Sequence, residues 1–181
     1  MGIAQLESAR LKHWLVVDTI NVPALRFHLR EAAIHSIVQP LFLGSQFEHL
    51  LELGPALIKL DSESHFQTLV SQNQQIRSNA ILFAFESSVN EAAIFIHLQQ
   101  LLYIHINNQP VLFRFYSPQF WLNTNADLLE SDKLTILGPA RKLIWCDDEE
   151  TMNAITREAS QGGAPRLPYH LNSPVFDSLL T

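Results

Sequence analysis

The chain has 181 residues, of which 47% are hydrophobic, and a formal net charge of −6. This length suits a single domain, and the hydrophobic content is enough to bury a core, which excludes a wholly disordered chain. The acidic balance comes without clustered Lys and Arg to neutralise phosphates, so we expect no nucleic-acid partner.

Cys146 is the only cysteine, which excludes an intramolecular disulfide and a Cys-rich zinc site. The first residues show no basic region followed by an apolar one, so we expect no signal peptide. No apolar run approaches the ~20 residues that span a bilayer, and we expect no membrane partner. These observations predict a cytoplasmic protein.

Five apolar runs, rich in Val, Ile, Leu and Phe, predict strands, and helical patterns lie between them. Several runs are continuous rather than alternating, which is typical of strands covered on both faces. The alternation predicts an α/β fold: one layered domain with about five mostly buried strands alternating with helices. The five predicted strands are His13–Ile20, Ala56–Leu60, Ala80–Phe85, Val111–Tyr116 and Lys142–Cys146.

Helix boundaries are indicated by capping residues. Ser88 and Glu91 have the spacing of a capping box, which predicts a helix from Ser88. The acidic run 147–150 complements a helix dipole and predicts a final helix from Glu149 to Ser160. From Gly162 the chain is rich in Gly and Pro. We therefore assign residues 1–161 to the α/β domain and 162–181 to a C-terminal arm that is flexible or partner-dependent.

Catalytic chemistry is weakly supported, because the sequence has no nucleophile elbow, P-loop or dinucleotide fingerprint. An alternative is a metal-dependent phosphoryl-transfer or hydrolytic enzyme in which Asp18 and the 147–150 carboxylates hold Mg²⁺. Helix capping accounts for the same residues and is favoured. Acidic neighbours would raise the pKa of Cys146 and make it a poor nucleophile. We expect no enzyme activity, metal or cofactor.

Arg114 is the one charged residue of the predicted strand Val111–Tyr116. Strand alternation places it on the same face as Leu112 and Tyr116. One interpretation pairs its guanidinium with an internal carboxylate such as Glu86 or Asp18. The other presents the guanidinium to a carboxylate or carbonyl of a partner. The residues alone leave both open.

Six segments, in chain order, resemble the family of type VI secretion effector chaperones, or adaptors, long described as a domain of unknown function. The segments are Trp14–Asp18, Pro40–Ser45, Gly54–Leu60, Ser87-Ser88 followed by His97-Leu98, Val111–Pro118 and Gly138-Pro139. The chain departs from the family pattern at Gln99 and Ser117, where arginine and aspartate are usual, and at Ile136-Leu137, where paired aromatics are usual.

This resemblance implies a cytosolic, non-enzymatic adaptor that binds a toxic effector and helps to load it onto the spike protein of the secretion machine. It also implies that the region after the shared domain varies with the effector, which here points to residues 162–181. The candidate partner-binding or family-motif residues are Asp18, His97, Arg114, Tyr116, Phe120, Trp121, Tyr169 and Phe176.

Overall fold

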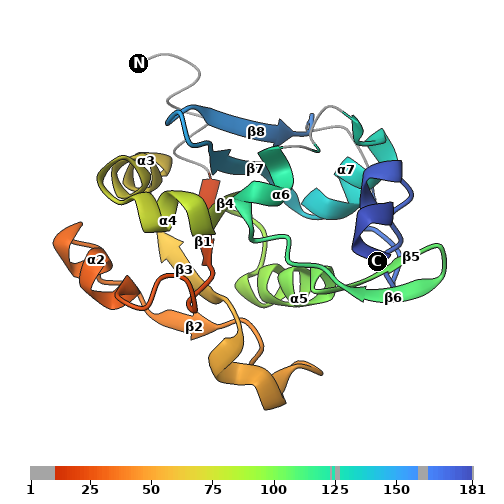
Figure 1. Cartoon of the computed structure of the whole chain (residues 1–181), viewed down its shortest axis with the longest axis horizontal. Coiled ribbons are helices and arrows are strands. Elements are labelled where there is room, and N and C mark those ends of the chain that lie inside the picture. Colours follow the sequence, from red (N-terminus) through yellow and green to blue (C-terminus); the bar gives the residue numbers. More distant parts are fainter. Residues whose placement is uncertain (1–10, 123, 125–126, 159–162, 181) are drawn as a thin grey trace.

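The computed structural model describes residues 11–122, 124, 127–158 and 163–180. A six-stranded antiparallel sheet with the order β2-β3-β1-β4-β7-β8 forms its centre, and a separate hairpin pairs β5 with β6 (Figure 1). The predicted α/β fold is confirmed. The strands are β1 (Leu11–Val17), β2 (Val38–Pro40), β3 (Ala56–Leu60), β4 (Ala80–Glu86), β5 (Tyr103–Ile106), β6 (Gln109–Leu112), β7 (Ala140–Cys146) and β8 (Met152–Thr156).

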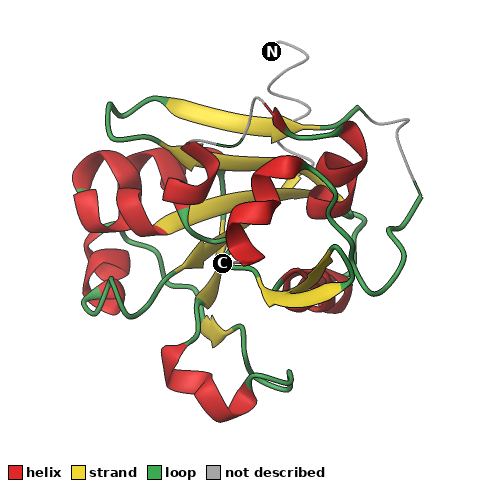
Figure 2. Cartoon of the chain, turned by 45° about the vertical axis from the view of Figure 1, so that its right-hand side comes forward, coloured by secondary structure: helices red, strands yellow, loops and turns green. Residues whose placement is uncertain are grey.

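Helices cover both faces of the large sheet (Figure 2). One face packs on α2 (Leu25–Glu31), α3 (Glu63–Gln72) and α4 (Gln74–Asn79). The other packs on α5 (Glu91–Leu101), α6 (Pro118–Leu122) and α7 (Glu130–Leu137), together with the small hairpin. The described residues also include two 3-10 segments, η1 (Glu48–Leu53) and η3 (Pro174–Leu180). None of the helices described here has the length and apolarity to cross a membrane.

The central strands owe their continuous apolar sequences to this two-sided burial. In β1, Trp14 and Val16 join the core on the α5 side, whereas Leu15 and Val17 join the core on the α2 side. Side chains of a strand alternate between faces, so a strand with helices on both sides needs apolar residues at every position. The pattern that predicted buried strands therefore has a direct physical cause, although the sheet is antiparallel.

The register between β1 and β4 fixes the position of the first candidate residue. Val17 lies opposite Ala80, so Asp18, the next residue, leaves the sheet beside Asn79. The Asp18 N–H donates to the Asn79 carbonyl at 2.9 Å. This end of β1 is therefore tied to the end of α4.

Three local predictions were wrong. β6 ends at Leu112, so residues 113–116 of the predicted strand form a loop and turn. Helix α5 is capped by Asn90, whose side chain accepts from the Ala92 N–H at 2.7 Å, and not by Ser88.

The third wrong prediction is the final helix from Glu149. The described part of this region forms a turn and strand β8, which pairs with β7 as a hairpin. The Asp147 carboxylate accepts from the backbone N–H groups of Glu149 and Thr151, which stabilises the turn between these strands. The acidic run thus caps a turn rather than a helix N-terminus. Residues 159 and 160 of the predicted helix lie outside the described residues.

Part of the predicted C-terminal arm, residues 169–180, packs against the domain. Tyr169, Leu171 and Phe176 are all buried. Backbone hydrogen bonds join both Tyr169 and Leu171 to His105 in β5. The predicted boundary at 161–162 falls outside the described residues, and a dependence of this segment on a partner stays a prediction.

A buried carboxylate holds the same segment from its other side. Asp132, in the first turn of α7, accepts from the backbone N–H groups of Asn172 and Ser173 at 2.9 and 2.6 Å and from the Ser173 hydroxyl. Asp132 is 1% exposed, so these donors replace the lost hydration of Oδ2, whereas the buried Oδ1 has no hydrogen-bond partner among the described residues. The C-terminal segment is therefore anchored by polar contacts as well as by its apolar side chains.

Candidate partner-binding site

The segment after β6 alternates between the core and the surface. Phe113 and Phe115 are fully buried, whereas the Arg114 side chain between them is 56% exposed. The Phe113 N–H donates to the Leu102 carbonyl at 2.9 Å, and the two phenyl rings anchor the loop in the core. The predicted alternation thus holds from Phe113 to Phe115 even though these residues do not form a strand, but it fails at Tyr116, which is 4% exposed.

Arg114 forms an ion pair with Asp18. One guanidinium nitrogen lies 2.7 Å from Asp18 Oδ2, and the carboxylate is 8% exposed. Asp18 also accepts from the Asn21 side chain at 2.9 Å and from the Ile20 N–H at 3.1 Å. Of the two internal carboxylates considered, Asp18 is the partner, because Glu86 pairs with Arg141 instead.

The Tyr116 ring also packs against the Arg114 guanidinium. The Arg114 guanidinium carbon lies 5.7 Å from the centre of the Tyr116 ring. Burial raises the pKa of the Tyr116 hydroxyl, an effect that the nearby guanidinium partly offsets. Burial lowers the pKa of Arg114, but Tyr116 and Asp18 outweigh it, so its pKa is raised and the side chain stays charged. The result is a fixed cation with an exposed surface.

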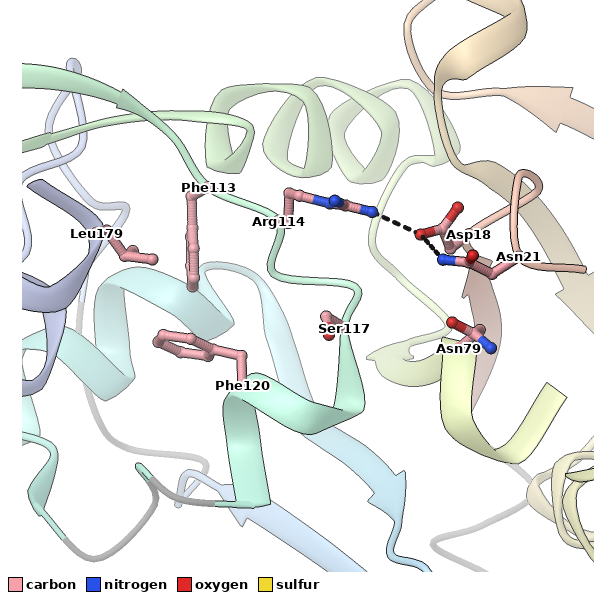
Figure 3. Close-up of a pocket in the computed structure, with 8 residues that line it drawn as sticks. All are labelled: Asp18, Asn21, Asn79, Phe113, Arg114, Ser117, Phe120 and Leu179. Atoms are coloured by element: carbon pink, nitrogen blue, oxygen red, sulfur yellow. Dashed lines mark hydrogen bonds and ion pairs between the residues drawn. The ribbon is translucent and has the colours of Figure 1, made fainter. Parts of the chain in front are cut away.

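A pocket of about 350 Å³ opens beside this ion pair (Figure 3). Its polar wall comes from the segment after β1, from α4 and from the turn before α6, and its apolar wall comes from the Phe113 ring, α6 and η3. Figure 3 shows Arg114 reaching across toward Asp18 and Asn21, with Phe113, Phe120 and Leu179 together on the other side. The lining residues are Asp18, Asn21, Asn79, Phe113, Arg114, Ser117, Phe120 and Leu179.

An aromatic cluster underlies the apolar wall. The Phe120 ring stacks on Phe176 with a centroid distance of 5.6 Å, and Trp121 meets Phe113 edge to face at 6.0 Å. The Trp121 indole N–H donates to the Phe115 carbonyl at 2.6 Å. Trp121 and Phe176 are both 0% exposed, so they support the site from the core and do not face a partner in this structure.

His97 and Tyr169 meet at a different, buried place. The Tyr169 hydroxyl lies 2.8 Å from His97 Nδ1, and the Ile136 carbonyl lies 3.0 Å from Nε2. A carbonyl can only accept, so Nε2 carries the proton and Nδ1 accepts from the hydroxyl. Burial lowers the pKa of His97 to about 4, which keeps the imidazole neutral. This contact braces α5 against the C-terminal segment.

Gly138 makes this packing possible. Its φ of +52° lies in the left-handed region, and a Cβ at this position would come within 2.2 Å of the His97 ring. Both the backbone conformation and the close approach therefore require glycine.

The resembling sequence segments contact one another in pairs. Asp18 pairs with Arg114, and the His97 ring packs on Gly138. A Cβ on Gly54 would lie 2.6 Å from the Phe42 ring, so these two segments are also in close contact. Six segments that are scattered along the chain are thus brought into contact by the fold, and two of them also pair as β1 and β3.

Gln99 and Ser117, two departures from the family pattern, lie in different parts of the structure. The Gln99 side chain donates to the Leu41 and Leu43 carbonyls at 3.0 and 2.7 Å. Ser117 lines the pocket, and its N–H donates to the Arg114 carbonyl. Gln99 therefore links α5 by hydrogen bonds to the segment before η1, whereas Ser117 lies in the pocket beside the Asp18–Arg114 ion pair.

The residues proposed for metal chemistry have other uses. Asp147 caps the β7–β8 turn, and Glu150 pairs with Arg77 at 2.9 Å. Within the described parts of the chain, no group of three or more His, Cys, Asp or Glu side chains could hold a metal ion. Cys146 is buried, and burial together with Asp147 raises the pKa of its thiol, as the acidic run predicted.

The sequence missed several lining residues. Asn79 reaches the pocket only through the register of β1 with β4, and Leu179 only through the fold of the C-terminal segment. Neither relationship leaves a local sequence pattern. Asn21, three residues after Asp18, is the one with a usable signal, because Asp-x-x-Asn spacing after a strand is typical of a hydrogen-bonded turn.

A family model described as a domain of unknown function (DUF4123) matches residues 13–130 of the chain. This is more than half of its length. The chain belongs to this family. Neither the curated proteins nor the solved structures contain a match. The DUF4123 region includes every lining residue of the pocket except Leu179, which comes from the C-terminal segment.

Proposed function

We propose that this protein is a cytoplasmic adaptor that binds one toxic effector of a type VI secretion system. It helps to load that effector onto the spike protein and performs no catalysis. The observation that carries the proposal is the DUF4123 match over residues 13–130. All of the segments that resemble effector adaptors, except Gly138-Pro139, fall within it.

The pocket at Asp18 and Arg114 has the chemistry of a protein-binding site. Arginine and aromatic side chains supply most of the energy of protein interfaces, especially where they are held in place before binding. Arg114 is held by Asp18 and Tyr116 while half of its side chain faces solvent. Phe113 and Phe120 add an apolar surface beside it. A partner would place a carboxylate or carbonyl on the guanidinium and an apolar side chain against the rings.

The composition of the pocket wall also supports the proposal. An adaptor needs a shared framework and a part that distinguishes its own effector. Here the framework residues come from the family domain, whereas Leu179 comes from outside the matched region. The same pocket would therefore combine a shared cation with a variable apolar contact.

Co-expression tests this proposal. We expect affinity-tagged protein to retain the toxin encoded by the neighbouring gene, or the spike protein, through purification. If the wild-type protein retains neither, the adaptor proposal is wrong.

A pair of arginine variants tests the site. Arg114→Ala should weaken effector binding at least about tenfold, which corresponds to about 1.4 kcal/mol. Arg141→Ala is the matched control, since Arg141 also pairs with a carboxylate but lies at the opposite end of β7 from the pocket. Equal affinities of the two variants by isothermal titration calorimetry would exclude the pocket as the contact.

A further inference from the structure

A second hollow lies between α2 and the segment that leads into β2. It has a volume of about 420 Å³. Its floor is apolar, formed by Leu29, Ile34 and Val38, and its rim carries Arg26, Arg30 and His35. These residues share no member with the pocket at Asp18.

The two arginines of the rim are uncompensated. Arg26 and Arg30 stand one helical turn apart on α2 and are exposed, and neither forms an ion pair with any residue that the structure describes. Glu31, the only acid of α2, does not line the hollow. Like charges at this spacing repel and destabilise a helix. In a protein of net charge −6, this concave cationic rim favours an anionic partner.

An open sheet edge runs beside the hollow. β2 ends the order of the sheet, and among the strands that the structure describes it pairs only with β3. The Leu41 N–H donates to the Pro55 carbonyl, and the register then gives Gln39 and Leu57 as the next hydrogen-bonded pair. Because bonding alternates along an antiparallel pair, the backbone N–H and C=O of Val38 point away from β3.

The side chains around this edge differ between its two faces. Val38 and Ser36 line the hollow, next to the arginines. Ile37, between them in sequence, lies on the opposite face and is 85% exposed. An added strand would therefore meet positive charge on one face and an exposed apolar side chain on the other.

We propose that the β2 edge and this hollow bind an extended acidic segment of a partner protein. The segment adds as a strand beside residues 36–38, and its backbone pairs with the outward groups of Val38. Alternate side chains are carboxylates that bind Arg26 and Arg30, and the intervening side chains are apolar and cover Ile37. The proposal concerns a site separate from the Asp18 pocket and does not depend on the partner being an effector.

A capped, fluorescein-labelled peptide of alternating Glu and Val tests the charge requirement. We expect it to bind in fluorescence anisotropy at low salt, and we expect the peptide with Lys in place of Glu not to bind. Arg30→Glu should weaken binding of the Glu peptide at least about tenfold. Arg166→Glu changes the net charge equally at an exposed position outside the hollow and should have little effect.

Backbone pairing is tested with modified peptides and with variants of Val38. N-methylation of alternate peptide residues blocks one edge of the added strand and leaves the other edge intact. We expect one of the two methylated peptides to lose binding and the other to keep it. In the protein, Val38→Pro should abolish binding by removing the outward N–H, whereas Val38→Ala keeps it.

Three results would overturn the proposal. They are no binding of the Glu peptide at millimolar concentration, equal binding of the Glu and Lys peptides, or equal effects of Arg30→Glu and Arg166→Glu. Equal binding of both methylated peptides would overturn the strand addition. Circular dichroism spectra of the variants confirm that each remains folded.

Discussion

Two long-range polar contacts join distant parts of this chain, and they differ in exposure. His97 and Tyr169 are 72 residues apart, and Asp18 and Arg114 are 96 apart. His97 and Tyr169 are 4% and 6% exposed, whereas the Arg114 side chain is 56% exposed. Both contacts involve family-motif residues. The buried contact can serve only the fold, whereas the open one can also serve a partner.

The hydrogen-bonding capacity of each contact supports this distinction. Both nitrogens of His97 are used, one by the Tyr169 hydroxyl and one by the Ile136 carbonyl. A guanidinium has five N–H donors, and one carboxylate oxygen does not satisfy them all. The following predictions test whether the buried contact controls stability and the open contact does not.

The largest effect is expected at Gly138. Gly138→Ala would place a methyl group against the His97 ring and force a left-handed residue, at a cost of about 2–5 kcal/mol in unfolding free energy. Gly44→Ala is the matched control. Gly44 has a φ of +72° but nothing within 4 Å of an added Cβ, so the cost should be about 1 kcal/mol. Urea denaturation measures both, and equal losses would show that the His97 contact is not close.

The second effect concerns pH. The pKa of His97 falls from 6.5 to about 4 on folding, so the unfolded chain binds more protons between these values. The contribution of the neutral His97 to the unfolding free energy is therefore fully present above about pH 6.5. It is lost as the pH falls toward 4, which lowers the unfolding free energy by about 3 kcal/mol. Burial also lowers the pKa of His13, which acts in the same direction. The unfolding free energy measured from pH 7 to pH 4 should decrease less in His97→Gln, and an unchanged slope would contradict this assignment.

A smaller effect is expected from the hydroxyl of Tyr169. Tyr169→Phe leaves the buried His97 Nδ1 without its donor and should cost about 1–3 kcal/mol. Tyr103 is half-buried and its hydroxyl forms no hydrogen bond with the described residues, so Tyr103→Phe should be nearly neutral. Thermal unfolding compares the two variants. Similar melting temperatures of the two variants would show that the Tyr169 hydroxyl does not stabilise the fold.

The smallest effect is expected at Arg114. Arg114→Ala should cost about 1 kcal/mol or less, because half-exposed ion pairs are weak and Asp18 keeps its bonds to Asn21 and the Ile20 N–H. A desolvated pair would instead cost about 3–5 kcal/mol. A loss of that size in chemical denaturation would make the ion pair a structural brace like the buried contact.

The sequence predicted the fold class and the positions of most central strands because burial on both faces leaves a strong apolar pattern. The apolar pattern does not give the order of the strands in the sheet. It therefore could not decide whether Asp18 or Glu86 is the partner of Arg114. That choice depends on which strand ends lie side by side. The acidic run 147–150 misled for a related reason, since carboxylates cap turns and helices alike.

The candidate site was predicted in part. Asp18, Arg114 and Phe120 line one pocket, and Tyr116 packs on the guanidinium. Trp121 and Phe176 were candidates because large aromatic residues are common at interfaces, yet the same residues fill cores equally well. Only the fold separates these cases, because it packs Phe176 against Phe120 and Trp121 against Phe113 in one core cluster.

The lone thiol of this chain offers a practical route to such measurements. Cys146 is buried and its raised pKa leaves little thiolate, so it should react slowly with alkylating reagents. A cysteine introduced at the exposed Gln119, next to Phe120, would then be the fastest-reacting thiol of the protein. A single dye could be attached beside the Asp18 pocket without first removing the native cysteine.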